Sequence, residues 1–424
     1  MTNQTTEQRD DIEALARQAA AAVDAEQVVR LTRDLVRLRS VVEPERGGNE
    51  EPVADYLMVL LRGWGLEPLR QDAAPGRPNV ICDWAGTGFD PDHHKTLMFE
   101  GHSDVVTEGD PDRWRYPPFE ARQVDGRIYG RGSADMKAGV AAALAALSAV
   151  RATAPRLAGR VRLGIVADEE GLMIGIKHFI AAGWADAVDG AIVCEPEQNE
   201  LCLFQKGAMR LHIRVTGVMS HGAMPYAGVN PLPVLAEIIG RIQQLEADEQ
   251  QRCGEHPYLG LPWITPTIVR APAHGEAQHN VVPETGYLGV DIRTVPGQDH
   301  DALLQAIDDI ATEVASRDDR LSAEVECFES RPWTETPADD PLVGALEEAY
   351  PLVLDEAPKY GGVPGATDGT FLHSQAGVPI VTVGPGDRTI PHQRDEYVDI
   401  AEIVKSARLY AAATVLFLST SKTT

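Results

Sequence analysis

The sequence predicts an α/β fold in which one domain with a mostly parallel central sheet is interrupted by an inserted, ferredoxin-like α+β domain. Two observations support this fold class. Short apolar runs alternate with helical stretches in the first half of the chain, which is typical of a doubly wound parallel sheet. The pattern changes near Lys206, where apolar and polar residues alternate as they do in half-exposed antiparallel strands. A chain of 424 residues is long enough for both domains.

The first part of the chain begins with helices and continues with buried strands. Apolar spacing predicts one helix over residues 9–38, a second over 51–64, and an alanine-rich helix over 137–152. Four short apolar runs predict buried strands. These runs cover residues 79–84, 96–101, 161–167 and 190–195.

The middle of the chain predicts the order β-α-β-β-α-β, the split βαβ motif of a ferredoxin-like sandwich. Its strands cover 208–218, 263–271, 285–295 and 321–329, and its helices cover 231–246 and 301–317. The α/β pattern returns with a strand over 378–386 and a final helix over 400–417. We therefore assign residues 1–207 and 330–424 to the α/β domain and residues 208–329 to the inserted domain.

Composition narrows the classes of function. The formal net charge of −26 argues against nucleic acid or an anionic membrane as a partner, because both require a basic patch. The N-terminus is polar and acidic, and no apolar run approaches the ~20 residues that span a bilayer, so we expect a cytoplasmic protein. The five cysteines are scattered and form no CxxC pair. Any metal must therefore be held by histidine and carboxylate.

Histidine and carboxylate residues follow the apolar runs, at the strand ends where ligands bind in open α/β sheets. They are His102 with Asp104, the run Asp168, Glu169 and Glu170, then Glu195 and His392, with Asp135 just before the alanine-rich helix. A single acid after a strand is usually a helix cap or a solvated loop residue. Their recurrence, without a competing thiol, predicts a site for Zn, Mn or Co.

The three adjacent acids must have different tasks. Neighbouring side chains in extended backbone point in opposite directions, so Glu169 and Glu170 cannot easily bind one ion from the same face. We expect Glu170 to face a metal and Glu169 to face water and substrate. Asp168 would face away as a hydrogen-bonding or capping residue, and Gly171 and Gly175 would allow a tight turn.

His102 and Asp104 form a second expected pair. Residues i and i+2 on a strand end share a face, and a metal-bound histidine usually donates its other ring N–H to a carboxylate. Asp104 is placed to accept that hydrogen bond. The alternative is an ordinary His–Asp contact at the surface.

Five motifs resemble one known family and occur in its order. They are GHSDVV, GRGSADMKAG, ADEEG, CEPE and PHQRDEYV. The sequence resembles the dinuclear zinc deacylases and peptidases that include acetylornithine deacetylase, succinyl-diaminopimelate desuccinylase, aminoacylase and glutamate carboxypeptidase. The resemblance covers nearly the whole chain and implies a zinc-exopeptidase-like catalytic domain with an inserted lid or dimerisation domain.

The resemblance also implies roles at the metal site. Asp135 would bridge two divalent ions, zinc first, with cobalt or manganese as alternatives. His102 and Glu195 would complete the first site, and Glu170 and His392 the second. Glu169 would remain free of metal as general base, and Asp104 would support His102. Glu at position 195 goes with deacylases and carboxypeptidases in this family, and Asp with dipeptidases.

Residues of the inserted domain and a late loop would bind substrate. By resemblance, His221 reaches the active site of a neighbouring subunit in a homodimer and stabilises the oxyanion. Asn280, Arg293, Gly365 and Thr367 would hold the substrate, with the arginine binding a carboxylate. The alternatives are a loop histidine without function and an arginine on a solvated strand face.

The leading hypothesis is a metal-dependent amide hydrolase that removes the acyl group from an N-acyl amino acid. A carboxypeptidase or dipeptidase of the same fold, acting on short peptides, shares all of these site residues. A relative that binds ligands without catalysis is a third class. The intact set of candidate residues argues against it, because a binding protein has no need of a metal-free base at Glu169.

Overall fold

The computed structural model describes residues 2–43, 49–420 and 422. The chain forms two compact units. Unit 1 consists of Met1–Leu203, Thr336–Gly361 and Thr367–Thr424, and unit 2 of Phe204–Glu335 and Gly362–Ala366. Unit 2 therefore extends a few residues beyond 208–329 at both ends. It also takes in a short segment that the sequence analysis assigned to the α/β domain.

The first helical region is divided in two, so the single helix predicted over 9–38 is wrong. The structure has α1 (Thr2–Ala21) and α2 (Ala25–Arg37), followed by α3 (Glu51–Gly63) close to its predicted range. Asp24 lies between the first two helices, and its side chain accepts a hydrogen bond from the Glu26 N–H. Such an N-cap begins a new helix, although the apolar spacing continues across it.

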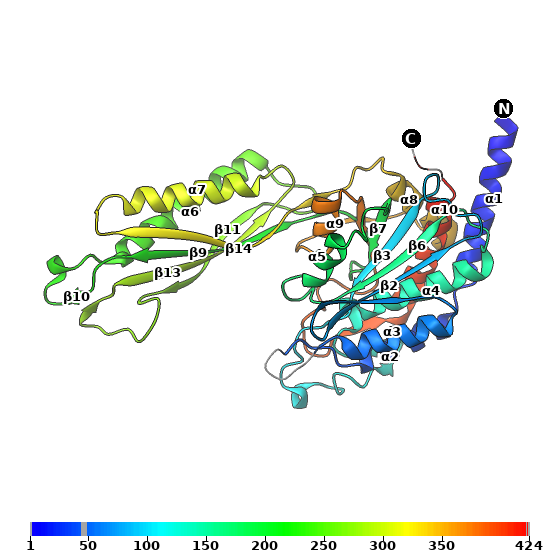
Figure 1. Ribbon diagram of the computed structural model, residues 1–424, viewed down its shortest axis with the longest axis horizontal. Coiled ribbons are helices and arrows are strands. Elements are labelled where there is room, and N and C mark those ends of the chain that lie inside the picture. The colour runs from blue at the N-terminus through cyan, green and yellow to red at the C-terminus, as the bar shows by residue number, and fades with distance from the viewer. Residues whose placement is uncertain (1, 44–48, 421, 423–424) are drawn as a thin grey trace. The chain divides into compact units, whose positions relative to one another are not determined.

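The central sheet has the order β1-β2-β6-β3-β7-β17-β8-β15, with β16 also pairing with β8. Its strands are β1 (Leu69–Ala74), β2 (Arg77–Ala85), β3 (Thr96–His102), β6 (Arg160–Val166), β7 (Gly190–Val193), β8 (Leu201–Gln205), β15 (Thr334–Glu335), β16 (Tyr360–Val363) and β17 (Ile380–Thr382). The four middle strands, β6, β3, β7 and β17, are parallel, which confirms the predicted central sheet; Figure 1 labels β6, β3 and β7. The strands β1, β2 and β8 are antiparallel to their neighbours.

Helices cover both faces of this sheet. They are α4 (Ala138–Thr153), α5 (Ile174–Ala181), α8 (Pro341–Leu354), α9 (Gly369–Ala376) and α10 (Ile400–Leu418). On one face, α4 and α10 pack against each other and against β3, and on the other, α5 and α9 close a core around Phe179 and Met98. A small sheet, β18-β5-β4, joins β4 (Arg122–Val124), β5 (Arg127–Tyr129) and β18 (Tyr397–Asp399).

One helical stretch is more apolar than the sequence analysis stated. Residues Ser133–Thr153, which include α4, are long and apolar enough to cross a membrane by length and composition. In the folded protein, 89% of the most apolar window is buried. Its alanines pack against neighbouring elements of unit 1, as in the core helix of a globular domain.

Unit 2 has the predicted ferredoxin-like arrangement. Its antiparallel sheet has the order β11-β13-β9-β14, and α6 and α7 pack on the sheet around a common core. The elements are β9 (Gly207–Thr216), α6 (Pro231–Cys253), β11 (Trp263–Arg270), β13 (Thr285–Thr294), α7 (His300–Ala315) and β14 (Ser322–Arg331). A two-stranded ribbon of β10 (Ser220–His221) and β12 (Val281–Val282) follows one end of this sheet.

Candidate metal centre

Six candidate residues from separate parts of the chain converge in unit 1. His102 is the last residue of β3, Glu169 and Glu170 lie in the turn after β6, and Glu195 follows β7. Asp135 lies in the helical turn Ser133–Lys137 that precedes α4, and His392 in the loop before β18. The meeting of strand ends at one edge of the parallel sheet accounts for this convergence.

Asp135 lies at the middle of the cluster, with one carboxylate oxygen toward each imidazole. Its Oδ1 is 3.0 Å from His102 Nε2, and its Oδ2 is 3.3 Å from His392 Nε2. Glu195 Oε1 lies 3.7 Å from His102 Nε2, and Glu170 Oε1 lies 2.9 Å from His392 Nε2. The contacts therefore form two trios, each with one imidazole, one glutamate and a different oxygen of Asp135.

Glu169 adjoins both trios. Its carboxylate can join His102 and Glu195 in a group whose ligand atoms all lie within 4.8 Å of one another. The contact pattern, in contrast, gives it no hydrogen bond or ion pair to either imidazole among the described residues. Among the described residues, the carboxylates within ion-pair distance of an imidazole Nε2 are those of Asp135, Glu170 and Glu195.

The pKa values of the buried glutamates and of both histidines are raised, but for different physical reasons. Burial raises the pKa of Glu169 and of Glu195, and neighbouring carboxylates raise both further. Burial opposes protonation of His102, but Asp104 and Asp135 outweigh it and raise the pKa of the imidazole. Hydrogen bonds to Asp135 and Glu170 raise the pKa of His392 to about 10. The cluster thus requires positive charge, which a divalent cation supplies in a carboxylate site.

The sequence predicts extended backbone at the two glutamates, but in the structure they lie in a turn. Asp168 has a φ of 70°, and the chain turns through Glu169 and Glu170. Asp104 is fully buried, and its carboxylate accepts the N–H of Glu169 at 3.2 Å and that of Glu170 at 3.1 Å. The separation of the two glutamates therefore arises from a braced turn rather than from strand alternation.

Asp104 also contacts His102, in a different way from the expected carboxylate bond. His102 Nδ1 lies 3.0 Å from the backbone carbonyl oxygen of Asp104 and 3.6 Å from its Oδ1. The shorter contact is to the backbone, so the carbonyl orients the ring. The carboxylate remains available for the turn described above.

Asp168 faces away from the cluster, in the expected structural role. Its carboxylate pairs with Arg77 at 2.7 Å and accepts the N–H of Leu172 and of Ile174, where α5 begins. A Cβ atom at Gly175 would lie 2.3 Å from the Ala167 carbonyl oxygen. The φ of Gly175 is not positive, so backbone strain does not explain the glycine. It is required because the neighbouring backbone leaves no room for a Cβ atom.

The candidate residues of unit 2 are not all together. His221 is exposed on β10, and the N–H of the next residue, Gly222, donates to the Asn280 carbonyl at 2.7 Å. Arg293 lies near the far end of β13, where it pairs with Asp291 at 2.8 Å. About eight residues of strand separate it from the His221 end, which corresponds to roughly 27 Å. His221 and Asn280 are therefore neighbours, and Arg293 is distant from both within unit 2.

The late loop contributes two buried polar residues, Thr367 and Asp368. Thr367 is 6% exposed, and its hydroxyl accepts the N–H of Gly369 at the start of α9. Gly365 is half-buried and belongs to the segment that groups with unit 2. Asp368 of the same loop, which the resemblance also places near the substrate, is fully buried and close enough for its charge to raise the pKa of Glu169.

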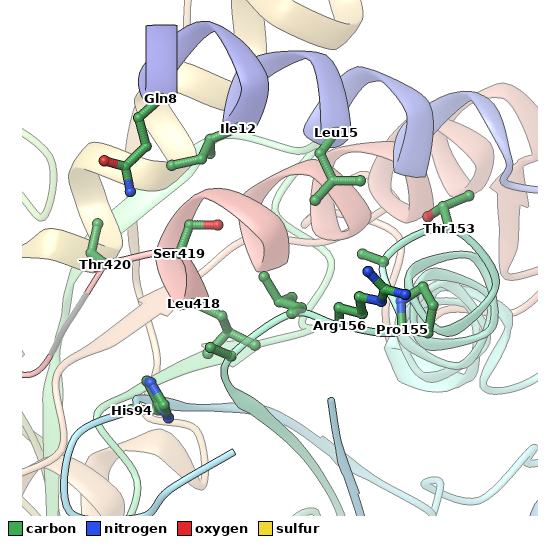
Figure 2. A pocket seen from close by; sticks show the side chains of 13 residues that line it. Gln8, Ile12, Leu15, His94, Thr153, Pro155, Arg156, Leu418, Ser419 and Thr420 are labelled. Carbon is green, nitrogen blue, oxygen red and sulfur yellow. The ribbon is translucent and has the colours of Figure 1, made fainter. Parts of the chain in front are cut away.

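Unit 1 also contains a cavity whose lining differs chemically from the carboxylate–imidazole cluster. A cavity of about 580 Å³ lies between α1 and the C-terminal ends of α4 and α10, with Ile12, Leu15 and Leu418 on its walls (Figure 2). His94 and Arg156 also line it, and no carboxylate or thiol does among the described residues. It therefore offers no set of ligands for a divalent cation.

A parallel α/β sheet with two imidazoles and several carboxylates at its strand ends defines the class of metal-dependent hydrolases. Comparison with known proteins identifies the family within this class. The chain belongs to the peptidase family M20/M25/M40, whose model matches residues 98–415. It is 31% identical to succinyl-diaminopimelate desuccinylase 1 of Ruegeria sp. (strain TM1040) over 392 residues, which cover 90% of this chain and 96% of that protein.

Two solved structures share the fold. An M20 family metallo-carboxypeptidase from Sulfolobus solfataricus superposes with a TM-score of 0.73 at 18% identity, over 92% of this chain and 99% of the other. A dinuclear metal-binding peptidase of the M20 family from Bacillus subtilis gives 0.68 at 17% identity, over 93% and 99%. The resemblance identified in the sequence is confirmed, and the protein is an amide-bond metallohydrolase of the deacylase type.

Proposed function

We propose that the protein removes the acyl group from an N-acyl amino acid by hydrolysis, with two divalent ions held in the carboxylate–imidazole cluster. The observation that carries this proposal is the position of Asp135, whose two oxygens face two different imidazoles at 3.0 and 3.3 Å. A carboxylate between two histidines in this way suits a bridge between two cations. Each trio supplies nitrogen and oxygen ligands, which fits zinc, cobalt or manganese.

The ligand assignment follows the two trios. His102, Asp135 and Glu195 would hold one ion, and His392, Asp135 and Glu170 the other. When bound, such ions lower the pKa of water and polarise a carbonyl oxygen. We favour zinc because catalytic sites of histidine and carboxylate commonly hold it.

Glu169 would act as the general base. Its carboxylate is buried and, among the described residues, forms no hydrogen bond or ion pair with His102 or His392. A carboxylate in this position can take a proton from the attacking water and return it to the leaving amine. Asp104 would hold this residue in place through the Glu169 N–H.

The proposed substrate is a small N-acyl amino acid, with an N-succinyl or N-acetyl group as the first candidates. The relative from Ruegeria is a succinyl-diaminopimelate desuccinylase, and its match covers nearly the whole chain. Arg293 is the proposed partner of the substrate carboxylate, and Asn280, Gly365 and Thr367 would complete the contacts. An arginine fork binds a planar carboxylate through two parallel hydrogen bonds.

We further propose a homodimer in which His221 and Asn280 serve the active site of the partner. Within one unit 2, the roughly 27 Å between the His221 end and Arg293 is too long for one small substrate to touch both. A two-fold dimer resolves this separation, because each site then takes Arg293 from its own chain and His221 from its neighbour. His221 would donate a hydrogen bond to the oxyanion. The net charge of −26 supports a cytoplasmic enzyme without nucleic-acid or membrane partners.

The test is a substrate panel with the full chain. N-succinyl, N-acetyl and N-carbamoyl amino acids and dipeptides are assayed after chelation and after addition of Zn²⁺, Co²⁺ or Mn²⁺. We expect activity on acyl amino acids that chelation abolishes and metal restores. Turnover unaffected by a chelator, in protein without bound transition metal, would exclude the proposed mechanism, and preference for dipeptides would exclude the deacylase substrate.

A further inference from the structure

Glu396, which lies outside the six candidate residues, connects the two segments that carry Asp135 and His392. It is fully buried. Its Oε1 accepts the N–H of Ala134 at 2.9 Å and that of Asp135 at 3.2 Å. Its Oε2 accepts a hydrogen bond from Arg131, and its backbone carbonyl accepts the N–H of Gly130 at 2.9 Å.

No carbonyl group of the helical turn can accept the two N–H groups that Glu396 binds. They stand at the start of the helical turn Ser133–Lys137, whose first N–H groups have no partner within the helix. Asp135 itself has φ −115° and ψ 98°, which are not helical values. One carboxylate oxygen therefore fixes the local backbone of the residue that faces both imidazoles.

The carboxylate of Glu396 has cationic groups of the protein as its neighbours. Arg131 is 3% exposed, pairs with Glu396, and stacks over the Trp114 ring with its guanidinium carbon 5.2 Å from the centroid. The ammonium group of Lys137 is also buried nearby and donates to the Leu38 carbonyl at 2.6 Å. A carboxylate with these partners has no need of a metal ion, so its role is to hold other groups in place.

Glu396 also restrains the loop of His392, which precedes it by four residues. The His392 side chain is 54% exposed, so little packing surrounds the ring itself. The loop is attached to the rest of unit 1 through the Glu396 side chain, through its carbonyl contact with Gly130, and through the Asp395 carboxylate, which accepts the Arg115 N–H at 2.6 Å. Movement of Glu396 would therefore displace His392 and Asp135 relative to each other.

We propose that Glu396 is a positioning residue that fixes Asp135 and His392 against each other, so that the ion of the His392 trio keeps its ligands. This inference rests on the proposed function, since it assigns a task within the same dinuclear site. The ion of the His102 trio depends less on Glu396, because His102 ends β3 and Glu195 lies two residues after β7.

Two variants separate the hydrogen bonds of Glu396 from its charge. Glu396→Asp keeps the charge beside Arg131 but is one methylene too short to reach both N–H groups. The double variant Arg131→Met with Glu396→Gln removes both charges but keeps an oxygen that can accept the two N–H groups. Val415→Ala, a core substitution in α10, is the control for lost stability. Its metal binding is compared with that of Glu396→Asp where the two variants lower the melting temperature by the same amount.

The measurement is calorimetric titration of each metal-free protein with Co²⁺ alone, which gives the number of ions and two dissociation constants. For Glu396→Asp we expect one of the two sites, that of the His392 trio, to lose affinity by roughly 10- to 100-fold, the scale seen for groups that orient ligands. The double variant and Val415→Ala should bind both ions as the parent does.

The outcomes are distinguishable. If Glu396→Asp binds both ions as tightly as the parent, or if the double variant loses an ion while Glu396→Asp keeps it, the positioning role is wrong. Equal loss in Val415→Ala would assign the effect to stability and overturn the inference. A parent protein that binds fewer than two ions would contradict the proposed function itself.

Discussion

The carboxylate of Asp104 accepts the backbone N–H of Glu169 at 3.2 Å, and its second oxygen accepts that of Glu170 at 3.1 Å. A single buried side chain thus sets the direction of two adjacent glutamates that the proposal gives different tasks. The same arrangement recurs at Glu396, which accepts two N–H groups around Asp135. Two buried carboxylates, those of Asp104 and Glu396, therefore fix the backbone of the candidate site by accepting its N–H groups.

We expect Asp104→Ala to weaken metal binding by roughly 10- to 100-fold, because the turn with Glu169 and Glu170 loses both of its acceptors. Metal dissociation constants of the metal-free protein measure this. Asp340→Asn is a suitable control, since Asp340 accepts the N–H of Leu342 at the start of α8, away from the site. Parental metal affinity in Asp104→Ala would show that the turn keeps its shape unaided.

Glu169→Gln should reduce kcat by roughly 10² or more while metal content stays near that of the parent, as expected for loss of a general base. Glu170→Gln should lose metal as well as rate, because Glu170 contacts His392 directly. Elemental analysis and steady-state kinetics on the same preparations measure both. Metal loss in Glu169→Gln alone would reverse the two assignments and support the alternative trio of Glu169 with His102 and Glu195.

Removal of metal should lower the melting temperature, because the buried carboxylates then repel one another without a cation. Addition of Zn²⁺ or Co²⁺ at 100 times the dissociation constant should stabilise the fold by about 2.7 kcal/mol for each site. Thermal unfolding at increasing metal concentration measures the effect. His392→Ala should show a smaller gain, and an equal gain would indicate that the ions bind elsewhere.

A mixture of His221→Ala and Glu169→Ala subunits should regain activity, although each variant alone is inactive. In the mixed dimer, one site combines a native Glu169 with the native His221 of the partner. Random exchange of equal amounts places such native sites at about a quarter of all sites. Turnover before and after subunit exchange measures the recovery.

The control for this experiment is a mixture of His221→Ala and Asn280→Ala. Both residues lie at the same end of unit 2, so each site of the mixed dimer receives one lesion and no recovery is expected. Full activity of His221→Ala in a monomer would exclude the contribution from a partner. Exchange without recovery in the first mixture would place His221 in the site of its own chain.

The sequence predicted the parallel strands and the converging histidines and acids, because burial and strand ends follow from local patterns of apolar residues. It did not predict the helix break at Asp24, since the apolar spacing runs on through the cap. It also misjudged the backbone at Glu169, because the left-handed φ of Asp168 is stabilised by Arg77 and by later residues of the turn.

The role of Glu396 is a second feature that the sequence did not predict. It belongs to the motif PHQRDEYV, but nothing in a linear sequence indicates that its side chain meets the N–H groups of Ala134 and Asp135. The antiparallel flanks of the central sheet were missed for a similar reason. Strand direction depends on short connections such as the hairpin between β1 and β2, whereas apolar runs look alike in either direction.

The division of unit 1 among distant stretches of sequence has a consequence for biosynthesis. His102 and Asp135 leave the ribosome well before His392, and all of Phe204–Glu335 is translated in between. Until His392 and Glu396 have been translated, the acids of the cluster lack the last imidazole and the carboxylate that binds the Asp135 N–H. In the proposed site, the ion of the His392 trio would therefore bind only after the segment with His392 and Glu396 has folded onto the rest of unit 1.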